Sequence, residues 1–272
     1  MNMKTLGPMA LLAAASYPAP SLTLGTDADP HATSGVPAVR QVSVADNGSQ
    51  GGQGIQDHGV STSFANPVQA GDSVWVVVTL SNYAGIHHNV GVRDSAGNTY
   101  LKLQELDDTN ASTSQSVWAF YAANVTGGFS TVTMAVDIDN DADVEDFLGV
   151  AAVELSGVHT ASLVGSSGQY QTVPASQADG ISSGSIRGRG LQQILLAASM
   201  NGSALGSPGQ INPGLGSGFS ALAAGWGFNL SLGPLLTVES RDIDMAKSLR
   251  NGVFSPRSSS TNDYLTVGAL FY

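Results

Sequence analysis

The acidic residues 137–146 are the stretch best suited to chemistry, since they gather five aspartates and one glutamate. Carboxylate oxygens are the ligands that Ca²⁺ prefers in proteins. Two positions do not suit the common calcium loop with ligands at alternate residues: Ala142 stands where that loop needs glycine, and Leu148 where it needs a bidentate glutamate. The stretch therefore predicts a solvated acidic loop between two strands, with calcium binding as the alternative. The candidate ligands are Asp137, Asp139, Asp141 and Asp143.

A second pattern with chemical meaning is Gly-Ile-Ser-Ser-Gly at residues 180–184, which matches the G-x-S-x-G motif of many hydrolases. In those enzymes the serine is a nucleophile because it lies on a sharp turn between a strand and a helix. Here the surroundings are rich in glycine and serine and show no helical period. A chance match is therefore the favoured interpretation of Ser182, and no residue is predicted to be catalytic.

Three tryptophans raise the question of stacking on a sugar. Trp75 and Trp118 lie inside apolar runs, which predicts core positions for both. Trp226 stands between two glycines, and it is the one candidate for an exposed ring that contacts a glycan.

The overall composition excludes several classes of protein. The net charge is −11 with only 10 lysines and arginines, so the basic footprint that nucleic-acid binding requires is missing. Arg187 and Arg189 are the densest basic spot and are too few to form a groove. The absence of cysteine excludes disulfides and thiolate metal sites. No segment is apolar for the roughly 20 residues of a membrane-spanning helix.

The elements that would position these residues are strands, because apolar and polar residues alternate with period two from residue 39 to the C-terminus. The runs at 73–80 and 147–155 are continuously apolar, which is typical of central strands. Only residues 191–200 could also be read as a helix. Further runs are at 42–44, 60–64, 89–93, 99–103, 116–122, 130–137, 180–186, 193–199, 235–240 and 264–271.

These runs, separated by glycine-rich turns, predict an all-β fold: an antiparallel β-sandwich, jelly-roll-like, with an extended N-terminal arm. The expected division is an arm or signal and linker segment at residues 1–38 and a single sandwich domain at 39–272. No internal repeat is strong enough to split that domain. Residues 89–93 and 99–103 are expected to form a hairpin, and residues 169–179 a long loop.

The order of four motifs resembles a glycine- and serine-rich β-sandwich domain found in uncharacterised bacterial surface and secreted proteins and in phage virion proteins. The motifs are Ala-Gly-Asp-Ser-Val-Trp-Val-Val-Val at 70–78, Val-Arg-Asp-Ser-Ala-Gly-Asn-Thr-Tyr at 92–100, Val-Trp-Ala-Phe-Tyr-Ala-Ala-Asn-Val-Thr-Gly-Gly at 117–128 and Val-Glu-Leu-Ser-Gly at 153–157. The resemblance covers residues 39–272. It implies a fold and a setting, and no catalytic residue.

Two functions from different classes are compatible with these observations. The first is a non-enzymatic virion structural protein of a bacteriophage, a capsid decoration, head-fibre or tail-associated subunit that contacts other virion proteins and copies of itself. An arm of about 38 extended residues could span on the order of 100 Å, enough to reach a neighbouring subunit. The alternative is a secreted or cell-surface adhesin or carbohydrate-binding module, for which residues 1–16 would be a cleaved signal peptide. No cofactor is expected other than the calcium alternative.

Overall fold

The structure is a computed structural model, and it describes the larger part of the chain. The described residues lie within one compact unit, residues 33–272. Their regular structure is entirely β, and every strand pairing is antiparallel, which confirms the predicted all-β sandwich. None of them forms a helix of the length and hydrophobicity that crossing a bilayer requires. The described ranges are 36–46, 57–82, 89–108, 114–137, 146–158, 163–174, 177–189, 191–201, 213–226, 235–243, 248–256 and 261–272.

The first half of this unit, residues 36–158, is a five-stranded sheet with the order β1-β8-β3-β6-β5 and a three-stranded outer sheet with the order β2-β7-β4. The first and last strands are neighbours, and the chain passes back and forth between the two sheets, as in a jelly roll. The strands are β1 Ala38–Asp46, β2 Asp57–Ser63, β3 Ser73–Asn82, β4 Asn89–Asp94, β5 Leu101–Asp108, β6 Ser114–Ala122, β7 Thr131–Asp137 and β8 Asp146–Ser156.

The second half, residues 163–272, contains a five-stranded sheet with the order β14-β15-β12-β18-β9. Two smaller sheets accompany it, β10-β17-β13 and the two-stranded β11-β16. The strands are β9 Leu163–Val173, β10 Ile181–Ser182, β11 Ile186–Arg187, β12 Gln193–Asn201, β13 Gly214–Leu215, β14 Ser220–Trp226, β15 Leu235–Ile243, β16 Leu249–Arg250, β17 Val253–Ser255 and β18 Asn262–Phe271.

The two halves share one strand order, although no internal repeat in the sequence is strong enough to predict it. Read from its other edge, the second five-stranded sheet is β9-β18-β12-β15-β14, so β9 takes the place of β1, β18 of β8, β12 of β3, β15 of β6 and β14 of β5. In the outer layer, β10 and β11 together replace β2, β16 and β17 replace β7, and β13 replaces β4. The described chain is therefore two jelly-roll windings in succession within one compact unit.

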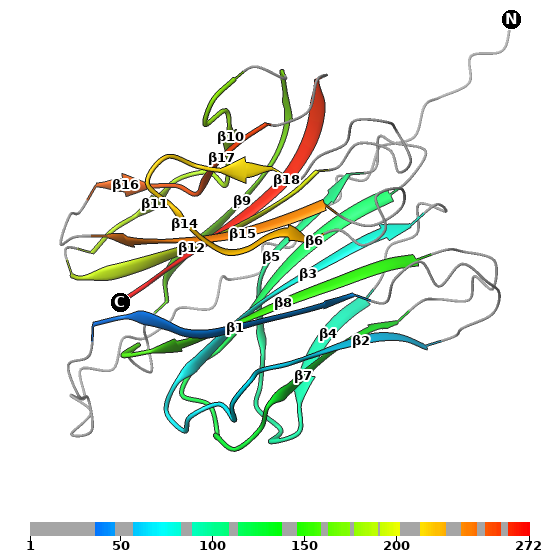
Figure 1. The fold of residues 1–272 in the computed structure, drawn as a ribbon, viewed down its shortest axis with the longest axis vertical. Coiled ribbons are helices and arrows are strands. Elements are labelled where there is room, and N and C mark those ends of the chain that lie inside the picture. The colour runs from blue at the N-terminus through cyan, green and yellow to red at the C-terminus, as the bar shows by residue number, and fades with distance from the viewer. Residues whose placement is uncertain are drawn as a thin grey trace, which may run out of the picture. The chain divides into compact units, whose positions relative to one another are not determined.

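The two five-stranded sheets pack face to face around one hydrophobic core (Figure 1). The rings of Tyr121 in β6 and Phe271 in β18 meet across it, with centroids 5.0 Å apart. Strand β5 contacts β9 at one edge, where Gln104 donates a hydrogen bond to Ser166, and β1 contacts β14 at the other edge. Equivalent strands therefore run across the stack in opposite order, as a twofold rotation between the halves would place them.

The outer faces of the two sheets are covered differently. In the first half, apolar side chains of the outer layer, among them Val60, Phe64 and Val132, pack on Val76, Trp118 and other residues of the five-stranded sheet in one large cluster. In the second half the cover consists of strands two or three residues long. It forms two small clusters, one around Phe254 and Tyr264 and the other around Ile186 and Leu270.

Three local predictions differ from the structure. The expected hairpin is wrong: β4 and β5 belong to different sheets, and the turn with Gly97 at φ +74° carries the chain from one sheet to the other. The expected loop at 169–179 is wrong in its first part, since β9 continues to Val173. The expected edge strand at 180–186 is two short strands, β10 and β11, which pair with different partners.

Candidate functional site

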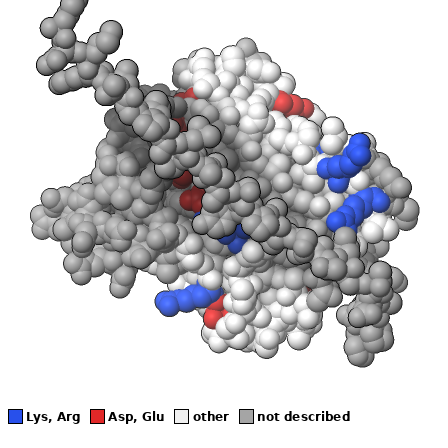
Figure 2. Space-filling view, turned by 180° about the vertical axis from the view of Figure 1, so that it is seen from behind, with Lys and Arg blue, Asp and Glu red and all other residues white. Residues whose placement is uncertain are grey.

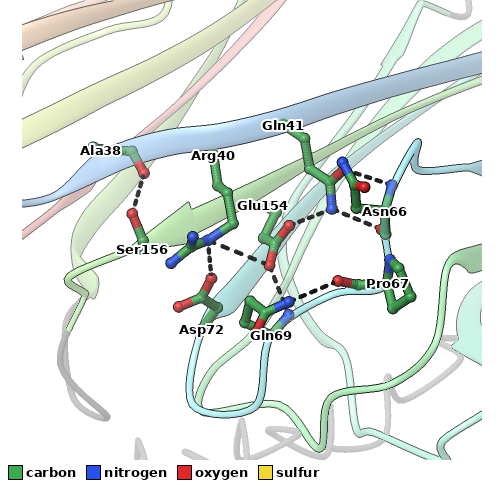
Figure 3. Close-up of polar contacts among 9 residues, drawn as sticks. All are labelled: Ala38, Arg40, Gln41, Asn66, Pro67, Gln69, Asp72, Glu154 and Ser156. Carbon is green, nitrogen blue, oxygen red and sulfur yellow. Dashed lines mark hydrogen bonds and ion pairs between the residues drawn. The ribbon is translucent and has the colours of Figure 1, made fainter.

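A polar cluster joins the start of β1 to three other parts of the first half (Figure 3). The Arg40 Nε lies 2.7 Å from the Asp72 Oδ2 and 3.7 Å from the Glu154 Oε1. Gln41 donates to the Glu154 Oε2, and the Gln69 backbone N–H donates to its Oε1 at 2.8 Å. These contacts fasten β1 to β8 and to the connection between β2 and β3.

The electrostatics of this cluster centre on Glu154, whose side chain is fully buried. Burial raises the pKa of Glu154, and the hydrogen bond from Gln69 opposes that rise. The Asp72 backbone extends the cluster, because its carbonyl accepts a hydrogen bond from Val125 in the connection between β6 and β7. Each polar atom named here is occupied in holding strands together, so the cluster is suited to fixing β1 in the fold.

Asp94 organises the crossing from the outer sheet to the five-stranded sheet in the first half. Its carboxylate accepts hydrogen bonds from the backbone N–H groups of Ala96 and Asn98 and from the Tyr100 hydroxyl. Burial, reinforced by the neighbouring Asp94, raises the pKa of Tyr100, which keeps the phenol protonated as a donor. The group stabilises a turn, and it contains no nucleophile or base directed at an open site.

The second half buries a carboxyl group beneath its outer cover. Glu239 lies on β15 and is fully buried. Its Oε2 accepts the backbone N–H of Gly216 at 3.1 Å, whereas its Oε1 is buried with no hydrogen-bond partner among the described residues. The backbone N–H of Val253 also interacts with this carboxyl group and favours its charged form. Burial raises the pKa of Glu239 to about 8, with a smaller contribution from the negative charge of Asp179. The side chain is thus a neutral acid at neutral pH that ties β13 and β17 to the sheet.

Backbone segments approach closely around this carboxyl group. A Cβ on Gly216 would lie 1.8 Å from the Val253 carbonyl oxygen, and a Cβ on Gly252 would lie 2.3 Å from the Ala197 Cβ. Only glycine fits at these two positions. The short strands of the cover therefore lie directly on the sheet.

The Ser182 side chain accepts hydrogen bonds within the outer cover of the second half. Its Oγ accepts hydrogen bonds from the Gly184 backbone N–H and from the Asn251 side chain, both at 3.1 Å. It lies on β10, which a turn connects to β11, so the strand-to-helix elbow that activates a serine nucleophile is not formed here. The neighbouring Ser183 Oγ accepts the Gly252 backbone N–H at 2.9 Å.

The structure does not describe the side chains of the residues predicted to bind calcium or a glycan. Asp137 is the last residue of β7, opposite Asp57 of β2, and Asp139, Asp141 and Asp143 lie outside the described residues. Trp226 ends β14 opposite Leu236, and its side chain is also outside what the structure describes. No group of three metal-ligating side chains occurs within the described ranges. The predicted core positions of Trp75 and Trp118 are confirmed, since both are buried.

Sequence reasoning missed the two buried glutamates. A signal existed, because each is a single acid within a run of β-branched and apolar residues, between Val153 and Leu155 in one case and next to Val238 in the other. An acid at such a position is buried with its strand and must find donors there.

Comparison of the chain with known protein families, with curated proteins and with solved structures gives no match. The class of protein is therefore defined by the fold alone: an all-β protein whose polar clusters, where described, fasten strands.

Proposed function

We propose that the chain is a non-enzymatic structural subunit of a bacteriophage virion, a capsid decoration, head-fibre or tail-associated protein that acts through contacts with other virion proteins and with its own copies. The observation that supports this proposal most is the repeated jelly-roll strand order. Jelly rolls recur in viral capsid proteins, where antiparallel sheets form stable surfaces with few exposed edges.

The use of polar groups in the fold also supports a structural role. The Arg40, Glu154 and Glu239 side chains bind other parts of the chain rather than facing an open site. A catalytic group needs access to a substrate and a poised partner. The two glutamates are buried and the half-exposed Arg40 is paired with Asp72, which favours a scaffold over an enzyme.

Particle fractionation tests the proposal. Phage particles released from cells that carry the gene are banded in a density gradient and analysed by mass spectrometry. The proposal expects the chain to band with the particles in a fixed ratio to the major capsid protein. Recovery only in the cell-envelope or soluble fractions would contradict it.

The jelly roll also occurs in lectins, so the adhesin or carbohydrate-binding module is kept as the second candidate. The position of Trp226 favours it, because this residue ends β14, an edge strand with a single neighbour in its sheet. A glycan array probed with the full chain and with W226A tests this candidate. Loss of glycan binding in W226A is expected if the tryptophan stacks on sugar.

A further inference from the structure

Two carboxyl groups hold the same part of the outer cover in the second half, the sheet β10-β17-β13, which we call the three-stranded cover. The Glu239 Oε2 accepts the backbone N–H of Gly216, and the Asp179 Oδ1 accepts that of Ser217, each at 3.1 Å. Asp179 also accepts a hydrogen bond from the Ser255 hydroxyl of β17 at 3.3 Å. The three-stranded cover is therefore attached at neighbouring points by one buried and one partly exposed carboxyl group.

The buried carboxyl group is out of reach of water while the three-stranded cover is closed. Glu239 is 0% exposed, and its Oε1 has no hydrogen-bond partner among the described residues. The chain just before β17 touches the sheet beside it, because a Cβ on Gly252 would lie 2.3 Å from the Cβ of Ala197, the residue opposite Glu239 in β12. A buried carboxylate with too few donors is costly. The ionised form of Glu239 therefore favours an arrangement in which the cover separates from the sheet and admits water.

The strands around Glu239 bring few charges to it. Strands β10, β13 and β17 carry no charged side chain, and the residues opposite Glu239 are Ala197 in β12 and Ala221 in β14. Arg241, two residues farther along the same face of β15, has its guanidinium over the Phe219 ring, 5.6 Å from the centroid. Uncharged atoms also make up most of the described surface drawn in Figure 2. Burial is therefore the main influence on the ionisation of Glu239.

Asp179 is a charged group that acts on Glu239. Hydrogen bonds from Ser217 and Ser255 lower the pKa of Asp179, so its carboxylate stays charged at neutral pH. This negative charge disfavours ionisation of Glu239 in the closed cover. Because the two carboxyl groups bind consecutive residues of the chain, a second negative charge would repel the first, and separation of the cover would relieve the repulsion.

Few apolar contacts hold the three-stranded cover. Its strands contribute two buried apolar side chains, Ile181 and Phe254, to a cluster of five residues. These strands are two or three residues long, so each forms few backbone hydrogen bonds. Segments with few buried contacts open locally at a lower free energy than the whole domain. The three-stranded cover can therefore separate while the five-stranded sheet beneath it remains folded.

We propose that the three-stranded cover is a pH-dependent flap, which separates from the five-stranded sheet when Glu239 loses its proton. The closed form keeps the proton, because burial raises the pKa of Glu239 to about 8, whereas in the open form the pKa returns to its ordinary value of 4.5. The open fraction therefore rises between pH 4.5 and about 8, and it does not rise further at higher pH. Opening exposes the apolar side chains of Phe254 and Tyr264.

Amide hydrogen exchange of the purified full chain, measured by mass spectrometry at pH 6 and pH 8, tests the proposal. Each rate is divided by the intrinsic exchange rate at that pH, which gives the protection of each segment. The protection of β13 and β17 is expected to fall about fiftyfold from pH 6 to pH 8, because the open form has released a proton that the closed form keeps. At pH 8 both strands are expected to be at least about tenfold less protected than β12, since the sheet stays folded when the cover opens.

E239Q keeps a side chain of the same size with no proton to lose. Its three-stranded cover is expected to have the same protection at pH 6 and pH 8. The matched control is E154Q, which changes the buried glutamate of the first half and is expected to retain the fall of about fiftyfold. Melting curves verify that each variant folds, and the comparisons within the unchanged chain need no variant.

Three results would each overturn the proposal. The first is a protection of β17 that is the same at pH 6 and pH 8, and the second is equal protection of β17 and β12 at pH 8. The third is a fall of the same size in E239Q. The purified chain is used without particles, so failure here is distinct from failure to band with virions.

Discussion

The two halves of this protein follow the same strand order and cover their outer faces by different means. The first half uses three strands of six or seven residues, with apolar side chains that continue the core outward. The second half uses strands of two or three residues, held by Glu239 and Ser183 through hydrogen bonds from backbone N–H groups. Two sheets with the same strand order can therefore have their outer faces covered in two ways, by apolar side chains or by short strands held through buried hydrogen bonds.

The largest expected effect contrasts the phenylalanines under the two covers. F254A in β17 removes a fully buried ring from a cluster of five residues, and F129A removes a buried ring from the larger first cluster. Both should lower the free energy of unfolding by about 3–5 kcal/mol in a denaturant titration. Only F254A should also increase amide exchange in β10 and β17, because few other apolar contacts hold them. Equal exchange in the two variants would remove the distinction between the covers.

The second effect is a pH dependence confined to the second cover. The pKa of Glu239 is raised from 4.5 to about 8, so the folded protein binds a proton that the unfolded chain releases. The stability from this group is complete below pH 4.5 and is lost as pH rises through 8. E239Q keeps a neutral side chain, and its stability relative to the unchanged chain should rise by about 2–3 kcal/mol between pH 6 and 8. Chemical denaturation at each pH measures this, with the exposed E105Q as control; parallel pH profiles for E239Q and the unchanged chain would contradict it.

A smaller effect is expected at the polar cluster of the first half. R40M removes the cation beside Asp72 and Glu154 and keeps the apolar stem. The loss of stability at pH 7 should be about 0.5–1 kcal/mol, because solvent screens the half-exposed arginine. Protonation of Glu154, whose pKa is already raised, should shrink the loss at pH 5. Melting of R40M at both pH values checks this, and a deficit that grows toward pH 5 would be inconsistent with the cluster as described.

The smallest effect is expected at Ser182. S182A removes an acceptor for the Gly184 N–H and the Asn251 side chain in a partly exposed position, where water can replace it, so the loss should be about 0.5 kcal/mol. Thermal melting measures it. Ester hydrolysis by the unchanged chain that S182A abolishes would reopen the nucleophile interpretation.

The central strands could be predicted from the sequence, because the apolar runs at 73–80 and 147–155 have no other stable placement than inside a sheet. Strand β9 could not, since its centre, residues 165–168, is Gly-Ser-Ser-Gly with no apolar alternation. Close packing favours glycine at both ends of this segment, because a Cβ on Gly168 would lie 3.0 Å from the Gln104 Oε1 of β5 and a Cβ on Gly165 would lie 3.0 Å from the Ile186 side chain.

The outer cover of the second half was also beyond prediction, because two-residue strands leave no period to detect. The candidate sites were predicted less well than the fold. The interpretation of the G-x-S-x-G match at Ser182 as a chance match stays a prediction, and the structure places this serine on a short strand with no helix after it. Glu239 was not singled out, because its burial depends on the approach of Gly216 and Val253, which are distant in sequence.

The reversed stacking of the two five-stranded sheets has a consequence for the surfaces of the molecule. Two identical chains related by a twofold axis would display every surface feature twice, so their two outer faces would be the same. Here the near-symmetric partners are covalently joined and differ in sequence, so each outer surface is free to be unique. The joined arrangement therefore allows the two outer faces of one molecule to carry different covers, as they do here.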